Sequence, residues 1–326
     1  MPLTFDLPLE QLRTYQGTNP KPADFDAYWE RALEDLAAVD PQLELVPAPF
    51  QADACECFDL FFTGVGGARV HAKLLQPKGK QTPHPALLMF HGYTGNAGDW
   101  MDKLSYVSQG FTVAALDVRG QGGSSDDAGG VSGNTLHGHI IRGLADALKG
   151  HPEKLLFRQV FLDTAELARI VMRMPGVDPD RVGATGGSQG GALTIACAAL
   201  EPRIRRAAVM YPFLSDYQRV WSIDLAKDAY TELREFFRLF DPTHASEEAV
   251  FENLGYIDIQ YLARRIEADV LWGIGLMDMV CPPSSQFAAY NKIVAPKSMV
   301  VYPDFEHENL PGFNDQALQF MRDMKA

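Results

Sequence analysis

Six short apolar runs, separated by segments of helical period, constrain the fold of this chain more than any other feature of its sequence. A parallel strand that is covered on both faces reads as a nearly continuous apolar run, because neither side of it meets water. Runs that alternate with helices are typical of an α/β fold with a parallel sheet. The six runs are residues 86–90, 111–117, 181–185, 207–210, 270–274 and 299–302.

An antiparallel hairpin is predicted upstream of these runs, at residues 57–63 and 70–75, where apolar and polar side chains alternate around a glycine-rich turn. The hairpin brings the total to eight strands. Helical spacing of apolar residues predicts helices at 24–36, 100–108, 158–173, 189–200, 285–293 and 314–324. We therefore expect a mostly parallel eight-stranded sheet with helices on both faces and an N-terminal helical extension.

The chain shows no internal repeat, low-complexity tract or linker, which favours one domain over residues 1–326, with residues 1–50 as the extension. Two intervals, 126–156 and 212–268, are much longer than the usual connection of about two to six residues. Long connections of this kind commonly form lids, pocket walls or subunit contacts. We interpret both as insertions into the domain.

Charge and cysteine content exclude several classes of function. The 42 acidic and 29 basic residues give a net charge of −13, which repels nucleic acid and anionic membrane surfaces. No apolar stretch reaches the roughly 18 residues of a membrane span, and the N-terminus lacks the pattern of a signal peptide. Four cysteines are too few for a disulfide scaffold, so we expect a cytoplasmic protein. Cys55 and Cys57 are interpreted as unpaired strand thiols, since a lone C-x-C lacks the second pair of a zinc site.

Ser188 is the candidate nucleophile, because it lies in G-x-S-x-G within the sequence GGSQGG, residues 186–191. The motif comes directly after a predicted strand and directly before a predicted helix, as a nucleophile elbow of the α/β-hydrolase fold requires. A glycine-rich phosphate-binding turn is the alternative. It is disfavoured because neither Gly-Lys-Ser/Thr nor G-x-G-x-x-G is present.

A base and an acid must follow the serine in this fold, in the order serine, acid, histidine. His307 comes just after the last predicted strand, where its imidazole can lie over the carboxyl edge of the sheet. His244 is the other histidine after the serine, but it lies within an insertion. Asp278 directly follows the run at 270–274 and is preferred to Asp304, which is close enough to the histidine to serve local turn geometry.

Oxyanion donors are expected from the amide of the residue after the nucleophile and from the loop after the first parallel strand. These are Gln189 and Tyr93. His91, in the same loop, is interpreted as a bracing histidine and not as a metal ligand, because no second ligand lies at metal-site spacing. Arg119, in RGQGGS, is expected to brace strand-end loops, with phosphate binding as the lesser alternative. His137 and His139 are interpreted as insertion or surface residues.

Several motifs, taken together, resemble those of carbohydrate esterase family seven, which contains acetyl xylan esterases and cephalosporin C deacetylases. The resemblance spans nearly the whole chain, whereas G-x-S-x-G alone indicates only the α/β-hydrolase superfamily. The motifs are HGYTGN at 91–96, RGQGGS at 119–124, GGSQGG at 186–191, GLMDMVCPP at 275–283 and EHE at 306–308.

The resemblance implies an intracellular serine esterase that removes acetyl groups from small acetylated carbohydrates, such as xylo-oligosaccharides, and from related esters such as cephalosporin C. Ser188, Asp278 and His307 match the family's triad, and Tyr93 and Gln189 match its oxyanion donors. The resemblance also implies a homohexamer whose active sites face an internal cavity. No metal or organic cofactor is expected.

Some features are open at this point. Pro212 and Phe213 follow a predicted strand beside Ser188 and are candidate walls of the acyl pocket. A peptidase or amidase on the same fold would use the same triad, although the chain lacks the additional gating domain common in such enzymes. A catalytically inactive hydrolase fold that acts as a binding protein is the third alternative, and the intact serine, acid and histidine argue against it.

Overall fold

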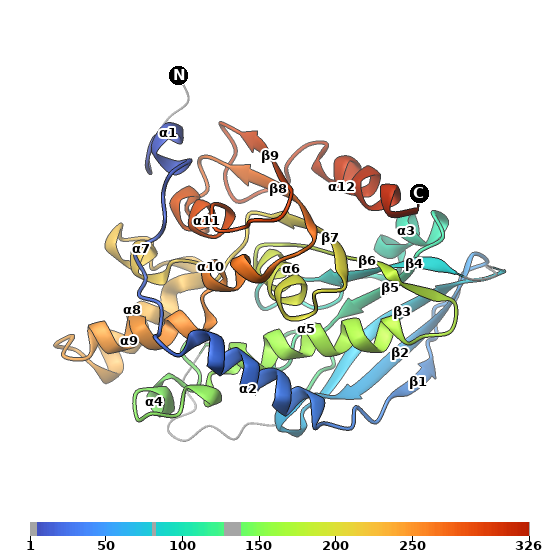
Figure 1. Cartoon of the computed structure of the whole chain (residues 1–326), viewed down its shortest axis with the longest axis horizontal. Helices are drawn as coiled ribbons and strands as arrows, with labels where there is room; N and C mark the ends of the chain where they lie inside the picture. The colour runs from blue at the N-terminus through green and yellow to red at the C-terminus, as the bar shows by residue number, and fades with distance from the viewer. Residues whose placement is uncertain (1–4, 80–82, 127–137, 326) are drawn as a thin grey trace.

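One mixed sheet of nine strands runs through the part of the chain that the structure describes, in the order β1-β2-β3-β5-β4-β6-β7-β8-β9 (Figure 1). The structure is a computed structural model and describes residues 5–79, 83–126 and 138–325. The strands β1 to β3 and the β3–β5 pair are antiparallel, whereas all pairs from β5 to β9 are parallel. The strands are β1 (Glu44–Pro47), β2 (Cys55–Thr63), β3 (Arg69–Pro77), β4 (His84–Phe90), β5 (Thr112–Leu116), β6 (Val177–Gly187), β7 (Ile204–Met210), β8 (Asp269–Gly275) and β9 (Lys297–Tyr302).

The α/β fold and its mostly parallel sheet are confirmed, and all eight predicted strands are present. The count of eight is one too low, because β1 pairs with β2 at the edge of the sheet. All four residues of β1 are exposed. A strand that buries neither face has no apolar run or alternation by which its sequence could indicate it.

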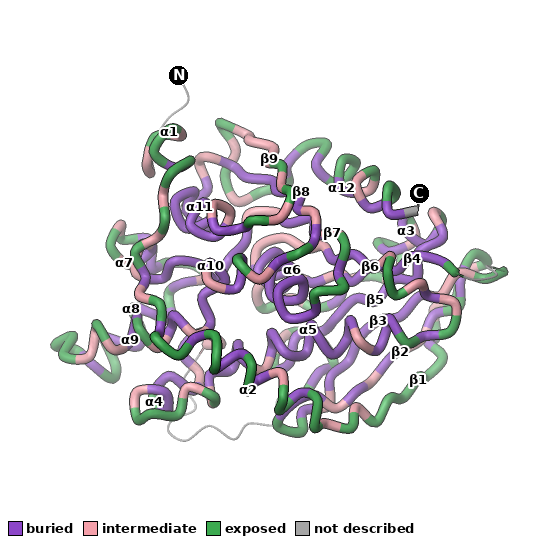
Figure 2. Tube along the Cα trace, in the orientation of Figure 1, coloured by how far each residue is buried: buried purple, intermediate pink, exposed green. Residues whose placement is uncertain are grey.

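Helices cover both faces of the sheet, as expected. The helices α2 (Phe25–Ala37), α5 (Leu156–Met172) and α6 (Gln189–Leu200) contribute to one apolar cluster. The helices α3 (Leu104–Ser108) and α12 (Phe313–Arg322) contribute to a second cluster on the opposite face. Figure 2 shows the strands between these layers as mainly buried, with exposure concentrated at the outer helices and at β1.

The helix α6 lies in the interior of the molecule, with all twelve of its residues buried. Its sequence, QGGALTIACAAL, is rich in glycine and alanine, and it contacts both β6 and β7. Small side chains allow this close approach, because the helix backbone can then lie directly against the sheet. The N-terminus of α6 is thereby fixed at the carboxyl edge of the parallel strands, where the candidate nucleophile lies.

Both predicted insertions are largely helical where the structure describes them, and they lie at the same end of the molecule (Figure 1). Residues 127–137 of the first insertion are outside the described residues. The short elements of the two insertions are α4 (Leu144–Ala147), η3 (Pro152–Lys154), α7 (Tyr217–Ser222), η4 (Asp228–Tyr230), α8 (Thr231–Phe240), α9 (Glu247–Leu254), η5 (Gly255–Ile257), α10 (Ile259–Leu262) and η6 (Ala263–Arg265).

The N-terminal extension is tied to the second insertion through the buried carboxylate of Asp216. This carboxylate accepts hydrogen bonds from the backbone N–H groups of Thr18 (2.9 Å) and Asn19 (2.8 Å) and from the hydroxyl of Tyr15 (2.8 Å). The remaining elements are α1 (Leu9–Leu12), η1 (Val65–Gly67), η2 (Trp100–Lys103), α11 (Pro283–Tyr290) and η7 (Asp323–Lys325). Among the described helices, none is long and apolar enough to cross a lipid bilayer.

Candidate active site

Ser188 occupies the sharp turn between β6 and α6, with backbone angles of φ 56° and ψ −122°. A non-glycine residue in such a conformation costs on the order of 1–3 kcal/mol and is retained only where its surroundings hold it. Here the Ser188 N–H donates to the carbonyl of Met210 (3.0 Å), and its carbonyl accepts from Phe213 (3.0 Å) and Ala192 (3.1 Å). The strained turn is therefore fixed by β7 and the residues that follow it.

The two glycines of G-x-S-x-G are required by the end of the neighbouring strand β4. A Cβ atom on Gly190 would lie 2.1 Å from the carbonyl oxygen of Phe90, and one on Gly186 would lie 2.7 Å from the same oxygen. Real Cβ contacts are not this short, and a backbone carbonyl cannot move aside cheaply. The elbow thus packs directly against the strand end that leads into the candidate oxyanion loop.

His307 lies in the loop between β9 and α12 and connects the three candidate triad residues. Its Nδ1 is 2.8 Å from Asp278 Oδ2, and its Nε2 is 3.0 Å from Ser188 Oγ. Because a carboxylate only accepts, Nδ1 carries the proton, which leaves Nε2 free to accept the serine hydroxyl. The ring of Tyr211 packs against the imidazole at 4.5 Å between centroids.

Asp278 is fully buried at the end of β8 and is oriented by donors on both of its oxygens. Oδ1 accepts the backbone N–H groups of Val280 (2.9 Å) and Cys281 (2.8 Å), and the amide of Gln286 lies 3.4 Å from Oδ2. These bonds direct Oδ2 toward His307. Asp304, the other candidate acid, is exposed.

His244 is not near this cluster. Its Nδ1 lies 2.7 Å from Glu247 on the exposed face of α9, and its ring stacks on Phe237. His244 therefore makes only local contacts within the second insertion, as expected from its position in the sequence.

Gln189 is the first residue of α6, so its backbone N–H has no acceptor within the helix and points out of the helix N-terminus. The side-chain amides of Gln189 and Gln121 donate to each other, at 2.7 and 3.0 Å. This reciprocal pair links the elbow to the RGQGGS loop. The two glutamines belong to separate sequence motifs, and neither motif indicates that they meet.

His91 braces the loop after β4, as expected. Its Nε2 accepts the N–H of Val118 (3.0 Å), which requires the proton on Nδ1, and Nδ1 donates to the carbonyl of Gly92 (2.7 Å). Burial lowers the pKa of His91, in agreement with this neutral form. Both ring nitrogens are used in holding the loop that carries Tyr93.

Arg119 joins the RGQGGS loop to α5. Its Nε and Nη2 form a paired contact with the carboxylate of Asp163, at 2.7 and 2.5 Å, and its Nη1 donates to the carbonyl of Val65 (3.0 Å). Both charged side chains are buried. The guanidinium is therefore engaged by protein groups, which favours the bracing role over phosphate binding.

A second histidine–carboxylate cluster lies beneath the same loops and was not predicted. His71, on β3, lies between two acids, with Nδ1 2.6 Å from Asp117 and Nε2 2.9 Å from Asp59. Asp117 also accepts the backbone N–H groups of Ala97 (2.6 Å) and Ser124 (2.9 Å). Burial alone would raise the pKa of Asp117, but these donors outweigh it and lower the pKa to about 2.

Tyr93 makes side-chain contacts that the sequence did not indicate. Its hydroxyl contacts the buried carboxyl group of Glu232, on α8, and lies 3.3 Å from Nδ1 of His139. Its ring packs on Phe213, 5.4 Å away. The surface role expected for His139 is therefore incomplete, since the residue contacts the oxyanion loop, and His137 lies outside the described residues.

The thiols suggest no separate metal or redox centre among the described residues. All four cysteines are free, which agrees with the unpaired thiols predicted at Cys55 and Cys57, and all four are buried. Burial raises the pKa of Cys57 to about 12. Cys281 lies with Asp278 and His307, their potential ligand atoms within 4.8 Å of one another. Burial raises the pKa of the Cys281 thiol well above its usual value, and Asp278 and His307 are engaged with each other.

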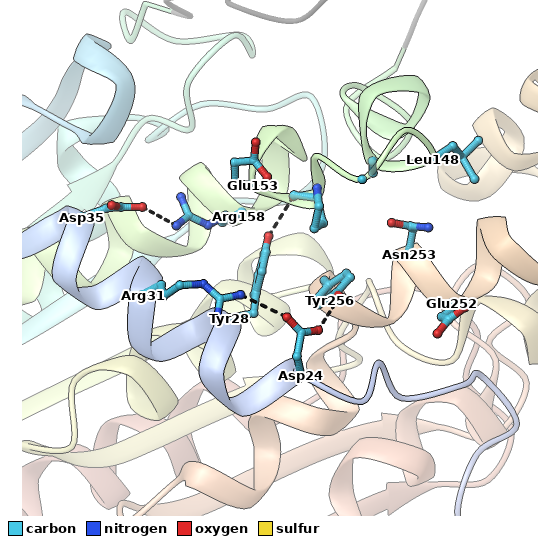
Figure 3. A pocket seen from close by; sticks show the side chains of 13 residues that line it. Asp24, Tyr28, Arg31, Asp35, Leu148, Glu153, Arg158, Glu252, Asn253 and Tyr256 are labelled. Carbon is cyan, nitrogen blue, oxygen red and sulfur yellow. Dashed lines mark hydrogen bonds and ion pairs between the residues drawn. The ribbon is translucent and has the colours of Figure 1, made fainter.

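A polar cavity of about 690 Å³ lies on the outside of the molecule, between α2, η3 and α9 (Figure 3). Its charged groups are largely paired with each other. Asp24 accepts from Arg31 (3.0 Å) and from Tyr256 (2.5 Å), and Arg158 donates to Asp35 (2.6 Å). Glu153 and Glu252 also line the cavity and pair with none of these groups.

Comparisons with known proteins agree with this geometry. The family model described as acetyl xylan esterase (AXE1) matches residues 1–324. The crystal structure of acetyl xylan esterase 1 from Thermoanaerobacterium sp. JW/SL YS485 is 60% identical, with a TM-score of 0.96 over 98% of this chain and 100% of that one. The acetyl xylan esterase from Paenibacillus sp. R4 is 33% identical, with a TM-score of 0.91 over 97% of this chain and 99% of that one.

A curated relative, the acetyl esterase Axe7A of Xylanibacter ruminicola, is 25% identical over 292 residues, which cover 88% of this chain. The aligned region spans 63% of the length of that relative, so the relative contains additional sequence.

Proposed function

Because the chain belongs to the acetyl xylan esterase (AXE1) family, we propose that it is a serine esterase that removes acetyl groups from small acetylated carbohydrates. Acetylated xylo-oligosaccharides and related acetyl esters such as cephalosporin C are the proposed substrates. The observation that carries the proposal is the continuous hydrogen-bonded chain from Ser188 Oγ through His307 to the buried carboxylate of Asp278.

Acylation begins when Ser188 Oγ attacks the acetyl carbonyl carbon and His307 Nε2 takes up the hydroxyl proton. The new C–O bond forms as the carbonyl π pair moves to the oxygen, which becomes the oxyanion. Asp278 stays ionised and stabilises the imidazolium through Nδ1–H. The intermediate collapses, the C–O bond to the sugar breaks, and the departing alkoxide receives the proton from Nε2. Water then repeats the sequence on the acetyl-enzyme and releases acetate.

The oxyanion is assigned to the backbone N–H groups of Tyr93 and Gln189. The Gln189 amide is at the N-terminus of α6, where the helix dipole favours negative charge. The loop of Tyr93 is held against the elbow by the Phe90 contact with Gly190 and by the His91 hydrogen bonds. Losing one donor of this kind typically reduces kcat by about 10²–10³-fold.

The acyl pocket is assigned to the segment after β7. Phe213 is fully buried between the ring of Tyr93, at 5.4 Å, and that of Tyr230, at 4.4 Å. We propose that these packed rings bound the space for the acyl group and disfavour longer acyl chains. We therefore expect acetyl esters to be preferred to butyryl esters.

Hydrolysis of p-nitrophenyl acetate by the wild-type protein and by Ser188→Ala tests the function. We expect a loss of about 10⁴-fold or more in kcat with unchanged folding, since the nucleophile is absent. Full activity in the variant would exclude the assignment. A series of acetyl, propionyl and butyryl esters, acetylated xylo-oligosaccharides and an aminoacyl amide would then separate the esterase from a peptidase on the same fold. Failure of a fluorophosphonate probe to label Ser188 would favour an inactive binding protein.

The organisation of the protein is proposed on more general grounds. We propose a single domain over residues 1–326, because strands from both ends of the chain join one sheet. A homohexamer is proposed from the family resemblance, and light scattering of the purified protein measures it. A cytoplasmic location agrees with four buried, unpaired thiols, and the net charge of −13 agrees with a neutral ligand in preference to nucleic acid.

A further inference from the structure

Glu232 is a buried acid that the catalytic chain does not use. It lies on α8 and is only 3% exposed. Its Oε2 accepts the backbone N–H groups of Ile140 (2.6 Å) and Ile141 (3.2 Å), and its Oε1 contacts the Tyr93 hydroxyl. A Cβ atom on Gly138 would collide with the carboxyl group, at 1.8 Å from Cδ. The carboxyl group thus connects the second insertion, the first insertion and the oxyanion loop.

The hydrogen bonds of His139 determine how protons are arranged in this cluster. Its Nε2 is 3.1 Å from the carbonyl of Gly120, which can only accept, so Nε2 carries a proton. In a neutral imidazole, Nδ1 is then an acceptor and must receive the hydroxyl proton of Tyr93, 3.3 Å away. The tyrosine oxygen also accepts the backbone N–H of His139 (3.3 Å), so it has no further hydrogen to place between itself and Glu232, and the contact with Glu232 needs a proton from the acid. This arrangement requires the protonated carboxylic acid.

The opposite arrangement requires a charge on the histidine. If Glu232 is ionised, the Tyr93 hydroxyl donates to its carboxylate. Nδ1 of His139 can then keep its contact only by donating, which makes the ring an imidazolium. The three side chains therefore hold one exchangeable proton, on either Glu232 or His139, and the Tyr93 hydroxyl reverses direction between the two states.

We infer that Glu232, Tyr93 and His139 share one proton, and that Glu232 is thereby a positioning residue for the Tyr93 oxyanion donor. The inference rests on the proposed function of the Ser188 site. Glu232 does not reach the reacting atoms itself. It acts by fixing the tyrosine side chain, and with it the backbone N–H of the same residue, against two other segments of the chain.

The electrostatic surroundings bring the change of protonation of Glu232 close to neutral pH. Burial raises the pKa of Glu232 to about 7, despite the backbone donors of Ile140 and Ile141, which lower it. The titratable side chains that face it are Tyr93 from the oxyanion loop, His139 from the first insertion and Glu235 from its own helix. Glu235 is exposed and adds a small further increase.

Kinetic measurements on Glu232→Gln and Glu232→Leu between pH 5 and 9, with p-nitrophenyl acetate, test the inference. Glutamine can accept from the backbone and donate to the tyrosine, so it imitates the protonated acid. Leucine can do neither, and we expect it to lower kcat by about 10–100-fold with KM within about twofold, because small displacements at a reacting centre reach this size. Glutamine should restore most of that loss, and its kcat relative to wild type should rise severalfold from pH 6 to pH 8.

Glu235→Gln is the matched control, since it removes an exposed acid from the same helix and, through the small contribution of Glu235 to the pKa of Glu232, should move the pH profile only slightly. A folded Glu232→Leu protein with wild-type kcat would overturn the positioning role. A constant ratio of Glu232→Gln to wild type over the whole pH range would overturn the shared proton.

If Glu232→Leu does not fold, the double variant Tyr93→Phe with Glu232→Gln decides the matter. We expect it to be no slower than Tyr93→Phe alone, because the shared hydroxyl is already absent. If the fold-decrease in kcat of the double variant equals the product of the fold-decreases of the two single variants, the inference is overturned. The Ser188→Ala result is independent of these outcomes: an active Ser188→Ala protein removes the proposed function, whereas an inactive one with wild-type-like Glu232 variants removes only this inference.

Discussion

Two imidazoles in this molecule, one half-buried and one buried, differ in one partner, and the difference separates the proposed catalytic base from a structural cation. His307 has a carboxylate on Nδ1 and the Ser188 hydroxyl on Nε2. His71 has a carboxylate on each nitrogen, Asp117 at 2.6 Å and Asp59 at 2.9 Å. A carboxylate can only accept, so both nitrogens of His71 are held as donors, whereas Nε2 of His307 is held as an acceptor.

The comparison shows that a histidine beside an aspartate is not by itself a catalytic signature. Burial opposes protonation of His71, but the two acids outweigh it and raise the pKa. The resulting cation holds Asp117, which orients the backbone of Ala97 and Ser124 in the two loops next to the active site. The His71 cluster therefore holds the loops beside the site in place, whereas the His307 cluster carries the proposed chemistry.

Asp278→Asn gives the largest expected effect that separates the two clusters. An asparagine can present its NH₂ group to Nδ1 and favour the wrong tautomer, in which Nε2 carries the proton and cannot accept from serine. We expect kcat for p-nitrophenyl acetate to fall by about 10⁴-fold while thermal stability changes little. A decrease of less than tenfold would show that the acid does not set the tautomer.

His71→Gln should have the reverse profile, with a large change in stability and a small one in catalysis. Removing a buried cation between two acids leaves Asp117 without its main partner, and breaking such a pair costs about 3–5 kcal/mol of the free energy of unfolding. Urea denaturation measures this loss. The kcat of the folded protein should stay within about tenfold of wild type, and a loss as large as that of Asp278→Asn would contradict the distinction.

The pH dependence of stability gives a smaller expected effect, whose direction can be predicted. The folded pKa of His71 is raised above its unfolded value, so its contribution is complete below about pH 6.5 and is lost as pH rises through the folded pKa. One such group changes the free energy of unfolding by at most about 1.4 kcal/mol per pH unit. The difference in stability between wild type and His71→Gln should therefore shrink from pH 6 to pH 9. A difference that grows with pH would reverse the assigned sign.

Asp59→Asn gives the smallest expected effect. The Asp59 side chain is 28% exposed, whereas that of Asp117 is 4% exposed, so solvent screens its attraction to the imidazolium. We expect a loss of about 0.5–1 kcal/mol in stability. Nε2 would then face an amide oxygen and keep a hydrogen bond. If Asp59→Asn lowers the free energy of unfolding as much as His71→Gln does, the two acids contribute equally to stability, and the buried carboxylate of Asp117 does not dominate.

The sequence predicted what strong local patterns encode. Each buried strand has its own apolar run, and Ser188, Asp278 and His307 each follow a predicted strand, so a shared sheet edge brings them together. The resemblance to a known family, carried by motifs at the strand ends, is confirmed by the family match over residues 1–324. Patterns within a few residues of one another were enough for these features.

What could not be predicted depends on contacts between distant and irregular segments. Glu232 is one of two acids in the short helix TELREFFRLF, and nothing local distinguishes it from the exposed Glu235. His71 lies within a strand that alternates normally, and its two acids are on β2 and after β5. The edge strand β1 buries no side chain. None of these features changes the local hydrophobic pattern.

The register of β4 and β6 sets the distance between two parts of the site. Phe90 pairs with Gly186 across these adjacent parallel strands. The loop of Tyr93 leaves one strand, and the elbow of Ser188 leaves the other, only a few residues beyond that pair. Adjacent strands lie about 4.8 Å apart wherever a sheet forms. The distance between the elbow of Ser188 and the loop of Tyr93 is therefore set by the backbone geometry of the sheet. The sequence of the outer insertions can change without altering this distance.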